Sequence, residues 1–234
     1  MILTVCPNPC IDYTYYIDGF KAGKLNRVNK KVESLSGKAI NVSIAVKRLG
    51  YDSYSTGFMF EDGAKKYFEK LSREDVPYIY AMCEGATRIN NKIISLPDMV
   101  LTEINEKGTA VAYEKQFELI ESVRSLSKDA SIIVFSGSLP PGIDDDFYYK
   151  AGKAVDSGCK IVVDAEGDRL LGTLKLRPAL IKPNLFELET AVNAKLDKEE
   201  DILKACDRLL NMGARCVLLS RGGDGAIIYN GKEA

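Results

Sequence analysis

Short apolar segments alternate with amphipathic segments along most of the chain. Ile132-Ile133-Val134 and Ile161-Val162-Val163 are apolar on both faces, which is typical of strands in a parallel sheet covered by helices on both sides. The alternation predicts a doubly wound α/β fold with right-handed crossovers. The expected strands are Ile2–Cys6, Ser53–Thr56, Tyr78–Met82, Ser131–Phe135, Lys160–Asp164, Ala179–Lys182 and Cys216–Ser220; the expected helices are Ile40–Leu49, Gly63–Ser72, Phe117–Leu126, Asp145–Ser157, Leu185–Val192 and Lys198–Met212.

Two parts of the chain depart from this alternation, at about residues 11–35 and 87–115. In each of them polar and apolar residues alternate with a period of two and no helical segment intervenes. This pattern is typical of antiparallel strands with one face in water. We expect these parts to form a small sheet inserted in the main domain, acting as a lid or an association surface. A sheet this small needs a partner to cover its apolar face. Its expected strands are Ile11–Gly19, Arg27–Leu35, Thr87–Ser95 and Met99–Glu103.

The charges of the chain nearly balance, with a formal net charge of −1 over 234 residues. No basic field is therefore available to attract nucleic acid or an anionic membrane. The apolar runs are of strand length, well short of the roughly 20 residues that a membrane helix needs. Met1–Val5 has no basic region before its apolar residues, unlike a signal peptide. We expect a cytoplasmic protein with small-molecule ligands and neither nucleic-acid nor membrane partners.

Cysteine and histidine usage narrows the chemistry further. The six cysteines are scattered, and we expect reduced, mostly buried thiols. Cys6 and Cys10 form a C-x₃-C pair with no second half, so metal binding there is disfavoured. The chain contains no histidine. Ser-His-Asp and Cys-His catalysis are therefore excluded, and a general base must be Asp, Glu, Lys or Tyr.

Polar and glycine residues follow the expected strands at the point where each strand ends. Ligands of open α/β sheets bind beyond the carboxyl ends of the strands, so these residues are expected at one edge of the sheet. Taken singly they have ordinary structural explanations as turns and helix caps. The segments concerned are 8–12, 136–142, 164–167, 182–188 and 220–225.

The loop Ser36–Asn41 leads from an extended segment into a strongly periodic helix. Its small residues permit close backbone approach, and the helix start and Lys38 favour an anion. The loop does not match the P-loop pattern, because no glycine lies five residues before Lys38 and Ala39 replaces Ser or Thr.

Gly222-Gly223-Asp224-Gly225 does not match the dinucleotide-binding fingerprint G-x-G-x-x-G. This mismatch disfavours a nicotinamide-dependent oxidoreductase.

The order of these motifs resembles the phosphofructokinase-B group of the ribokinase superfamily, over nearly the whole chain. Within the group, Thr87–Asn90 and Thr102–Asn105 are most similar to 1-phosphofructokinases and tagatose-6-phosphate kinases. The resemblance implies a ribokinase-like three-layer αβα fold, with a mostly parallel central sheet and a β lid that often pairs between subunits. It also implies ATP and Mg²⁺ as cofactors. The motifs are Asn8-Pro9-x-x-Asp12, Ser36–Ser43, Thr87–Asn90, Ser136–Gly142, Lys182-Pro183-Asn184-x-x-Glu187-Leu188 and Ser220-x-Gly222-x-x-Gly225-Ala226.

The resemblance assigns an acceptor side and a nucleotide side. On the acceptor side it implies that Asp12 and Asn41 bind sugar hydroxyls, and that Ser138 and Gly37 border the sugar. Arg27, Lys38 and Arg88 would hold the phosphate that the sugar already carries. On the nucleotide side, Lys182, Asn184 and Glu187 match the element that organises Mg²⁺ waters, Asp164 would join Glu187 near the metal through water, and Ser220, Gly222 and Gly225 would border ATP.

Three departures from the group pattern qualify this assignment. Ser36 and Ala39 stand where glycine is more common, which leaves the choice of sugar open. The Gly-Ala-Gly-Asp motif, which in the group supplies the anion hole and the catalytic base, does not occur in the 234 residues. We therefore expect residues 1–234 to be one incomplete ribokinase-like domain with little kinase activity by itself, whose catalytic base would come after Ala234.

The leading hypothesis is an ATP-dependent kinase that converts D-fructose 1-phosphate to the 1,6-bisphosphate. The resemblance also implies a homodimer formed through the lid. Tagatose 6-phosphate is the next candidate substrate, and fructose 6-phosphate is a third. The alternative of another class is a non-catalytic binder of sugar phosphates that keeps only the acceptor half of a kinase.

Overall fold

The computed structural model describes residues 1–232 and contains a mostly parallel sheet of eight strands. The strand order is β12-β11-β10-β9-β8-β1-β4-β5. All neighbouring pairs are parallel except β11 and β12, as the apolar segments predicted. The strands are β1 Ile2–Cys6, β4 Ser53–Phe60, β5 Tyr78–Ala86, β8 Ile132–Ser136, β9 Lys160–Asp164, β10 Leu180–Ile181, β11 Val217–Ser220 and β12 Ala226–Tyr229.

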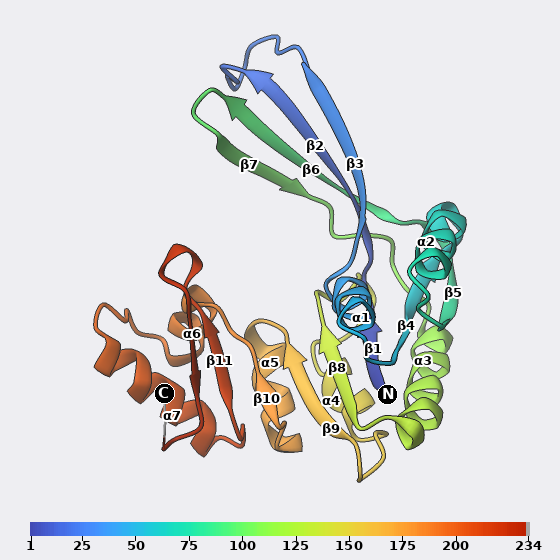
Figure 1. Ribbon diagram of the computed structural model, residues 1–234, viewed down its shortest axis with the longest axis vertical. Helices are drawn as coiled ribbons and strands as arrows, with labels where there is room; N and C mark the ends of the chain where they lie inside the picture. The colour runs from blue at the N-terminus through green and yellow to red at the C-terminus, as the bar shows by residue number, and fades with distance from the viewer. Residues whose placement is uncertain (233–234) are drawn as a thin grey trace.

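Helices pack on both faces of this sheet and complete a three-layer arrangement (Figure 1). Along β1 the side chains alternate: Leu3 and Val5 belong to one apolar core, and Cys6 belongs to the other. The core around Cys6 is closed by α1 Lys38–Arg48 and α2 Glu61–Arg73. The larger core is closed by α3 Tyr113–Leu126, α4 Phe147–Gly152, α5 Gly167–Thr173, α6 Leu185–Val192 and α7 Glu199–Asn211, with short 3₁₀ turns at Ser127–Asp129, Leu174–Leu176 and Gly222–Asp224.

Two helices differ from the sequence prediction. The helix expected at Asp145–Ser157 is only Phe147–Gly152, and a turn follows in which Asp156 Oδ1 accepts a hydrogen bond from the Gly158 amide. Aspartate side chains compete with helical hydrogen bonding in this way. Helix α5 was not predicted, because its seven residues are too few to show a helical period.

The second sheet has four strands in the order β3-β2-β6-β7 and projects from the main sheet (Figure 1). It consists of two antiparallel hairpins, β2–β3 and β6–β7, as predicted. A parallel pairing of β2 with β6 joins the hairpins, and the sequence did not predict that pairing. We call this sheet the lid; its strands are β2 Cys10–Asp18, β3 Lys30–Ser36, β6 Arg88–Leu96 and β7 Val100–Asn105.

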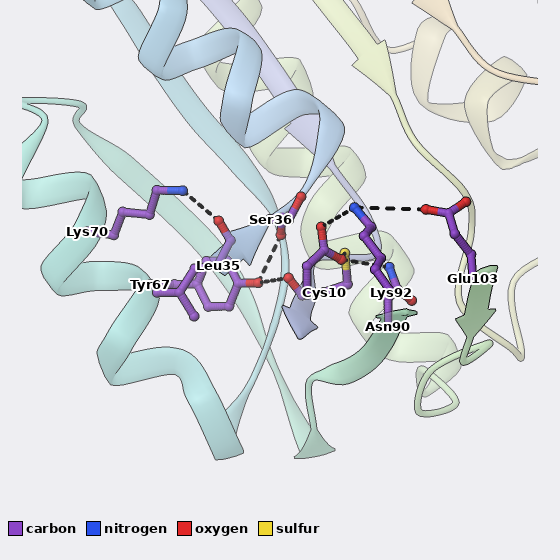
Figure 2. A network of polar contacts seen from close by, with 9 residues as sticks. Cys10, Leu35, Ser36, Tyr67, Lys70, Asn90, Lys92 and Glu103 are labelled. Carbon is purple, nitrogen blue, oxygen red and sulfur yellow. Dashed lines mark hydrogen bonds and ion pairs between the residues drawn. The ribbon is translucent and has the colours of Figure 1, made fainter. Parts of the chain in front are cut away.

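Helix α2 holds the base of the lid. The Tyr67 hydroxyl lies 2.5 Å from the main-chain oxygen of Cys10 and 2.9 Å from that of Ser36, and Lys70 donates to the main-chain oxygen of Leu35. These contacts tie the first residue of β2 and the last residues of β3 to the main domain (Figure 2). Within residues 1–232, none of the helices combines the length and apolarity needed to cross a membrane.

Candidate active site

A cavity of about 300 Å³ lies where the lid joins the carboxyl ends of β1 and β8. Its walls come from the end of β1 and the β1–β2 connection, all four lid strands, the start of α1, the turn after β8 and the residues after β9. The structure thus gathers most of the predicted acceptor side at the predicted edge of the sheet. Asp12, Gly37, Lys38, Arg88 and Ser138 all line the cavity.

Asp12 on β2 is the most buried of the carboxylates that line this cavity. Its Oδ2 lies 3.0 Å from Lys92 Nζ, and its Oδ1 accepts hydrogen bonds from Asn90 Nδ2 at 3.0 Å and from Cys10 Sγ at 3.5 Å. Burial opposes ionisation of the carboxyl, but the hydrogen bonds from Lys92 and Asn90 outweigh it and lower the pKa of Asp12 below its usual value. Asp12 is therefore an ionised acceptor at neutral pH, the form that binds hydroxyl donors.

One face of β6 lines the cavity with three polar side chains, those of Arg88, Asn90 and Lys92. They are two residues apart, so the strand presents them on one side of the lid. In the parallel pairing Asn90 lies opposite Asp12. Of these three residues, only Arg88 had a role predicted from the sequence. The period-two spacing of polar residues in 88–92 was the signal for the other two.

Arg88 is already bound to the main chain at the base of the lid. Its Nε and Nη2 donate to the oxygen of Asn8 at 3.3 and 3.2 Å, and its Nη1 donates to the oxygen of Glu106 at 3.2 Å. Of the five N–H donors of a guanidinium group, two are left for a ligand. Arg88 thus connects the loop after β1 to the end of β7 while facing the cavity.

Two buried amide oxygens in the cavity wall have no hydrogen-bond partner among the described residues. They are Asn8 Oδ1 and Asn90 Oδ1, and both side chains belong to residues at least nine-tenths buried. The Asn8 amide nitrogen donates to Lys107 O at 3.0 Å and to Ser138 Oγ at 3.3 Å. Buried polar atoms normally have partners, so Asn8 and Asn90 each bring one unsatisfied hydrogen-bond acceptor to the wall of the cavity.

The Ser36–Asn41 loop has the predicted form, with one difference. Gly37 approaches the main domain so closely that a Cβ there would lie 2.8 Å from Cys6 Sγ, and Lys38 begins α1. Asn41, predicted to bind a sugar hydroxyl, lies in the first turn of α1 with an exposed side chain and is not among the residues that line the cavity. The rise of about 1.5 Å per helical residue carries Asn41 farther along the helix axis than Lys38, which lies at the cavity wall.

Arg27 also lies away from the cavity. It is in the connection between β2 and β3, at the free end of the lid (Figure 1). Within one chain, Arg27 therefore does not join Lys38 and Arg88 as the sequence predicted, because the strands of the lid carry this connection outward.

Asp164, at the end of β9, links the two sides of the site. Its Oδ1 lies 3.1 Å from Lys182 Nζ and 3.8 Å from Lys38 Nζ, and its Oδ2 accepts a hydrogen bond from Ser136 Oγ at 2.9 Å. One carboxylate thus lies between a lysine of the acceptor loop and a lysine that follows β10.

The residues predicted for the nucleotide side lie at the ends of β10 and β11. Asn184 and Glu187 form a reciprocal capping box at the start of α6: each side chain accepts a hydrogen bond of 2.8 Å from the other's amide. Asn184 forms an isolated parallel β-bridge with Ser220, the last residue of β11. Gly222 and Gly225 have φ of +60° and +83°, and space around both positions is open. The predicted nucleotide residues are therefore adjacent and leave an open glycine-lined edge.

The predicted catalytic base, like Asn41 and Arg27, is not part of this cavity. Sequence analysis expects it after Ala234, and Ala234 itself lies outside the described residues, 1–232. The expectation of a base beyond that position therefore stays a prediction. The described residues provide the acceptor side and the nucleotide edge on which such a base would act.

The family of the chain follows from its sequence profile. The profile described as pfkB family carbohydrate kinase matches residues 7–234. The chain belongs to the pfkB family.

Individual members of the pfkB family are similar over nearly the whole chain. The chain is 32% identical over 233 residues to a 1-phosphofructokinase from Borreliella burgdorferi, covering 100% of the chain and 75% of that protein. It is 30% identical over 237 residues to a tagatose-6-phosphate kinase from Staphylococcus epidermidis, covering 100% of the chain and 76% of that protein. The crystal structure of phosphofructokinase-2 from Escherichia coli in complex with substrates and products has a TM-score of 0.89 at 26% identity, covering 99% of this chain and 76% of that one. The three-layer fold with its small second sheet is thus the fold of the pfkB family.

The carboxylates of this pfkB chain suit a metal that keeps most of its water. Among residues 1–232, no three Asp, Glu or Cys side chains are grouped closely enough to form a protein cage for a metal ion. Asp164 ends β9 and Glu187 lies in the first turn of α6, and both carboxylates already accept hydrogen bonds. Mg²⁺ binds through one or two carboxylates, several waters and substrate phosphates, and this donor set fits that mode.

Proposed function

We propose that the chain forms the substrate site of an ATP-dependent kinase of ketose phosphates. The observation that carries the proposal is the set of side chains that line one cavity. The acceptors are the ionised carboxylate of Asp12 and the amide oxygens of Asn8 and Asn90. The cations Lys38, Arg88 and Lys92 line the same cavity. Carboxylate and amide oxygens accept hydrogen bonds from sugar hydroxyls, and Arg and Lys bind phosphate. A volume of about 300 Å³ is at the small end of ligand sites and suits a monosaccharide phosphate.

We propose D-fructose 1-phosphate as the preferred acceptor, converted to the 1,6-bisphosphate. The relative from Borreliella burgdorferi named 1-phosphofructokinase supports this choice. Tagatose 6-phosphate is the alternative, supported by the relative from Staphylococcus epidermidis. Both sugars place a phosphate and a reacting hydroxyl at opposite ends of a ketose, so the same acceptor groups serve either one.

ATP and Mg²⁺ are the proposed cofactors. Lys182, Ser220, Gly222 and Gly225 lie at the edge where ATP phosphates would approach, and the open space at the glycines lets a ligand reach their amides. Asp164 and Glu187 would hold Mg²⁺ through water. The metal would neutralise charge on the transferring phosphoryl group, and Lys38 and Lys182 would orient the phosphates on either side of Asp164.

We propose that the lid pairs with the lid of a second copy. In the sequence it belongs to the two inserted segments, at about residues 11–35 and 87–115 of a single domain. Several of its large apolar side chains are exposed, among them Leu25, Val28, Val100 and Ile104. Exposed apolar surface of this kind marks an association site. The free thiols of all six cysteines support a reducing, cytoplasmic location.

We further propose that the 234-residue polypeptide by itself binds ketose phosphates but turns them over poorly. It contains no Gly-Ala-Gly-Asp motif to supply a base and an anion hole, and such preorganised groups are usually the largest catalytic contribution. The hypothesis of a non-catalytic binder therefore remains the alternative for the isolated polypeptide.

Isothermal titration with fructose 1-phosphate, tagatose 6-phosphate and fructose 6-phosphate tests the acceptor site, and a coupled ADP-release assay tests turnover. Saturable binding of a ketose phosphate that Asp12→Asn abolishes is expected. No binding of any of the three sugars by the wild-type chain would contradict the proposed function.

A further inference from the structure

Lys92 is a cavity cation with one hydrogen-bonded partner among the described residues, Asp12. Glu103 Oε1 is 4.0 Å from Lys92 Nζ, beyond hydrogen-bond distance. An ammonium group carries three donors, so two remain for a ligand. The side chain is 31% exposed, which means that part of it faces the cavity solvent.

Arg88 is held by hydrogen bonds to the main chain, whereas Lys92 is held by a side chain. Three of its donors are bound to main-chain oxygens of Asn8 and Glu106, which are fixed by the fold. Lys92 pairs with a side chain instead, through a flexible stem of four carbons. Of these two lid cations, Lys92 is the one whose ion pair can be exchanged without moving the backbone.

The position of Lys92 on the lid matches the phosphate end of a ketose phosphate. Its Cα lies about 13 Å beyond that of Arg88 along β6, at about 3.3 Å for each residue of a strand, toward the free end of the lid. In the proposed reaction the hydroxyl that is phosphorylated faces the nucleotide edge near Asp164. The opposite end of the sugar, which carries the existing phosphate, therefore points toward the lid.

Binding of a sugar at Asp12 competes with Lys92. Oδ1 of Asp12 already accepts from Asn90 and Cys10, and Oδ2 accepts from Lys92. A sugar hydroxyl that donates to Oδ2 weakens the pair and leaves the ammonium group partly uncompensated, which is costly for a charge that is two-thirds buried. A phosphate on the same ligand removes this penalty by accepting from Lys92.

We propose that Lys92 is a specificity-determining residue: it neutralises Asp12 in the free protein and transfers its ion pair to the phosphate of the bound sugar. An unphosphorylated ketose weakens the Lys92–Asp12 pair and offers Lys92 no anion in return, so the pair disfavours that ligand. The proposal rests on the proposed function, because it assumes that the cavity binds a ketose phosphate.

The test compares fructose 1-phosphate with fructose by isothermal titration and measures the ratio of their dissociation constants. Lys92→Met and Lys92→Gln should lower this selectivity by about tenfold or more, the contribution of one charge-assisted hydrogen bond. Lys92→Arg should retain it, since the charge is kept. Lys66→Met is the matched control: it removes a lysine paired with the lid carboxylate of Glu33 at 2.8 Å, outside the cavity, and should leave the ratio unchanged.

Two results would overturn the proposal. If Lys92→Met and Lys92→Gln weaken both sugars equally, Lys92 only holds Asp12 in place. If both variants bind fructose 1-phosphate as the wild type does, Lys92 does not contact the phosphate. Failure of the wild-type chain to bind fructose 1-phosphate and tagatose 6-phosphate would instead contradict the proposed function itself, and the inference with it.

Discussion

The carboxylate of Asp164 lies 3.1 Å from the ammonium group of Lys182. Lys182 follows β10 on the proposed nucleotide side, and Asp164 ends β9 next to the turn that borders the cavity. The side chain of Asp164 is 14% exposed, whereas that of Lys182 is 37% exposed. The pair therefore lies at the boundary between the two halves of the proposed active site, with its carboxylate on the more buried side.

Asp164→Asn should change how ATP binding depends on Mg²⁺. The substitution removes the carboxylate that would hold the metal through water and frees Lys38 and Lys182 to bind phosphates directly. We expect ATP to bind without Mg²⁺ at least as tightly as in the wild type, and the gain in affinity on adding Mg²⁺ to fall by about tenfold, the loss of one charged contact. Titration of ATP with and without Mg²⁺ measures both. Asp145→Asn, which removes one of the two ion-pair partners of Arg169, is the control, and an identical response of the two variants would contradict the role of Asp164.

The contribution of Glu187 to helix capping can be separated by mutation from its proposed contribution to Mg²⁺ binding. Glutamine at the third position of a helix still completes a capping box, so Glu187→Gln should leave the free energy of unfolding within a few tenths of a kcal/mol and raise the Mg²⁺ concentration needed for ATP binding. Asn184→Ala removes the cap and should cost about 1 kcal/mol. Urea unfolding and Mg²⁺ titration measure the two effects. An unchanged Mg²⁺ profile in Glu187→Gln would leave Glu187 with the capping role only.

Arg88→Ala should weaken binding of the ketose phosphate by about tenfold to a hundredfold, the contribution of a hydrogen bond to a charged group, and leave ATP affinity unchanged. The selective loss is expected because Arg88 lines the cavity proposed to bind the sugar, whereas the glycine-lined edge lies after β11. Isothermal titration of both ligands, with thermal unfolding to confirm folding, provides the measurement. Equal loss of sugar and ATP binding would contradict the division into two sides.

Stability should depend on the ionisation of Asp12. Its pKa is lowered in the folded protein, so the carboxylate contributes stability that is complete above its unfolded pKa, near 3.8, and is lost as the pH falls through the folded value. The free energy of unfolding should therefore decrease in this acidic range. Asp12→Asn should flatten that part of the profile measured by urea unfolding. An unchanged slope would show that the network of Asn90 and Lys92 does not favour the carboxylate.

Gly37→Ala should destabilise the protein by about 1–3 kcal/mol, the usual cost of overpacking, because the new Cβ would lie 2.8 Å from Cys6 Sγ. Cys6→Ala removes the obstructing sulfur. In the double variant the two effects should be less than additive, which a double-mutant cycle by urea unfolding measures. Strictly additive losses would show that the loop relaxes away from Cys6.

The order of residues along the chain was enough to establish the αβα class and the edge of the sheet where the site lies. Apolar segments with a period of two or 3.6 report local burial, and the carboxyl ends of parallel strands must share one edge. Asp12, Gly37, Lys38, Arg88 and Ser138 follow or adjoin such strands, and their meeting in one cavity could be anticipated from that order.

Which polar groups pair inside the cavity depends on the three-dimensional fold. The parallel pairing of β2 with β6 places Asp12 opposite Asn90 and within reach of Lys92, and no local pattern encodes the register between strands separated by more than 70 residues along the chain. The same pairing directs the β2–β3 connection outward and takes Arg27 away from the cavity. The physical reason is that strand periodicity fixes which face a residue occupies, whereas its partners across the sheet are fixed by packing of the whole chain.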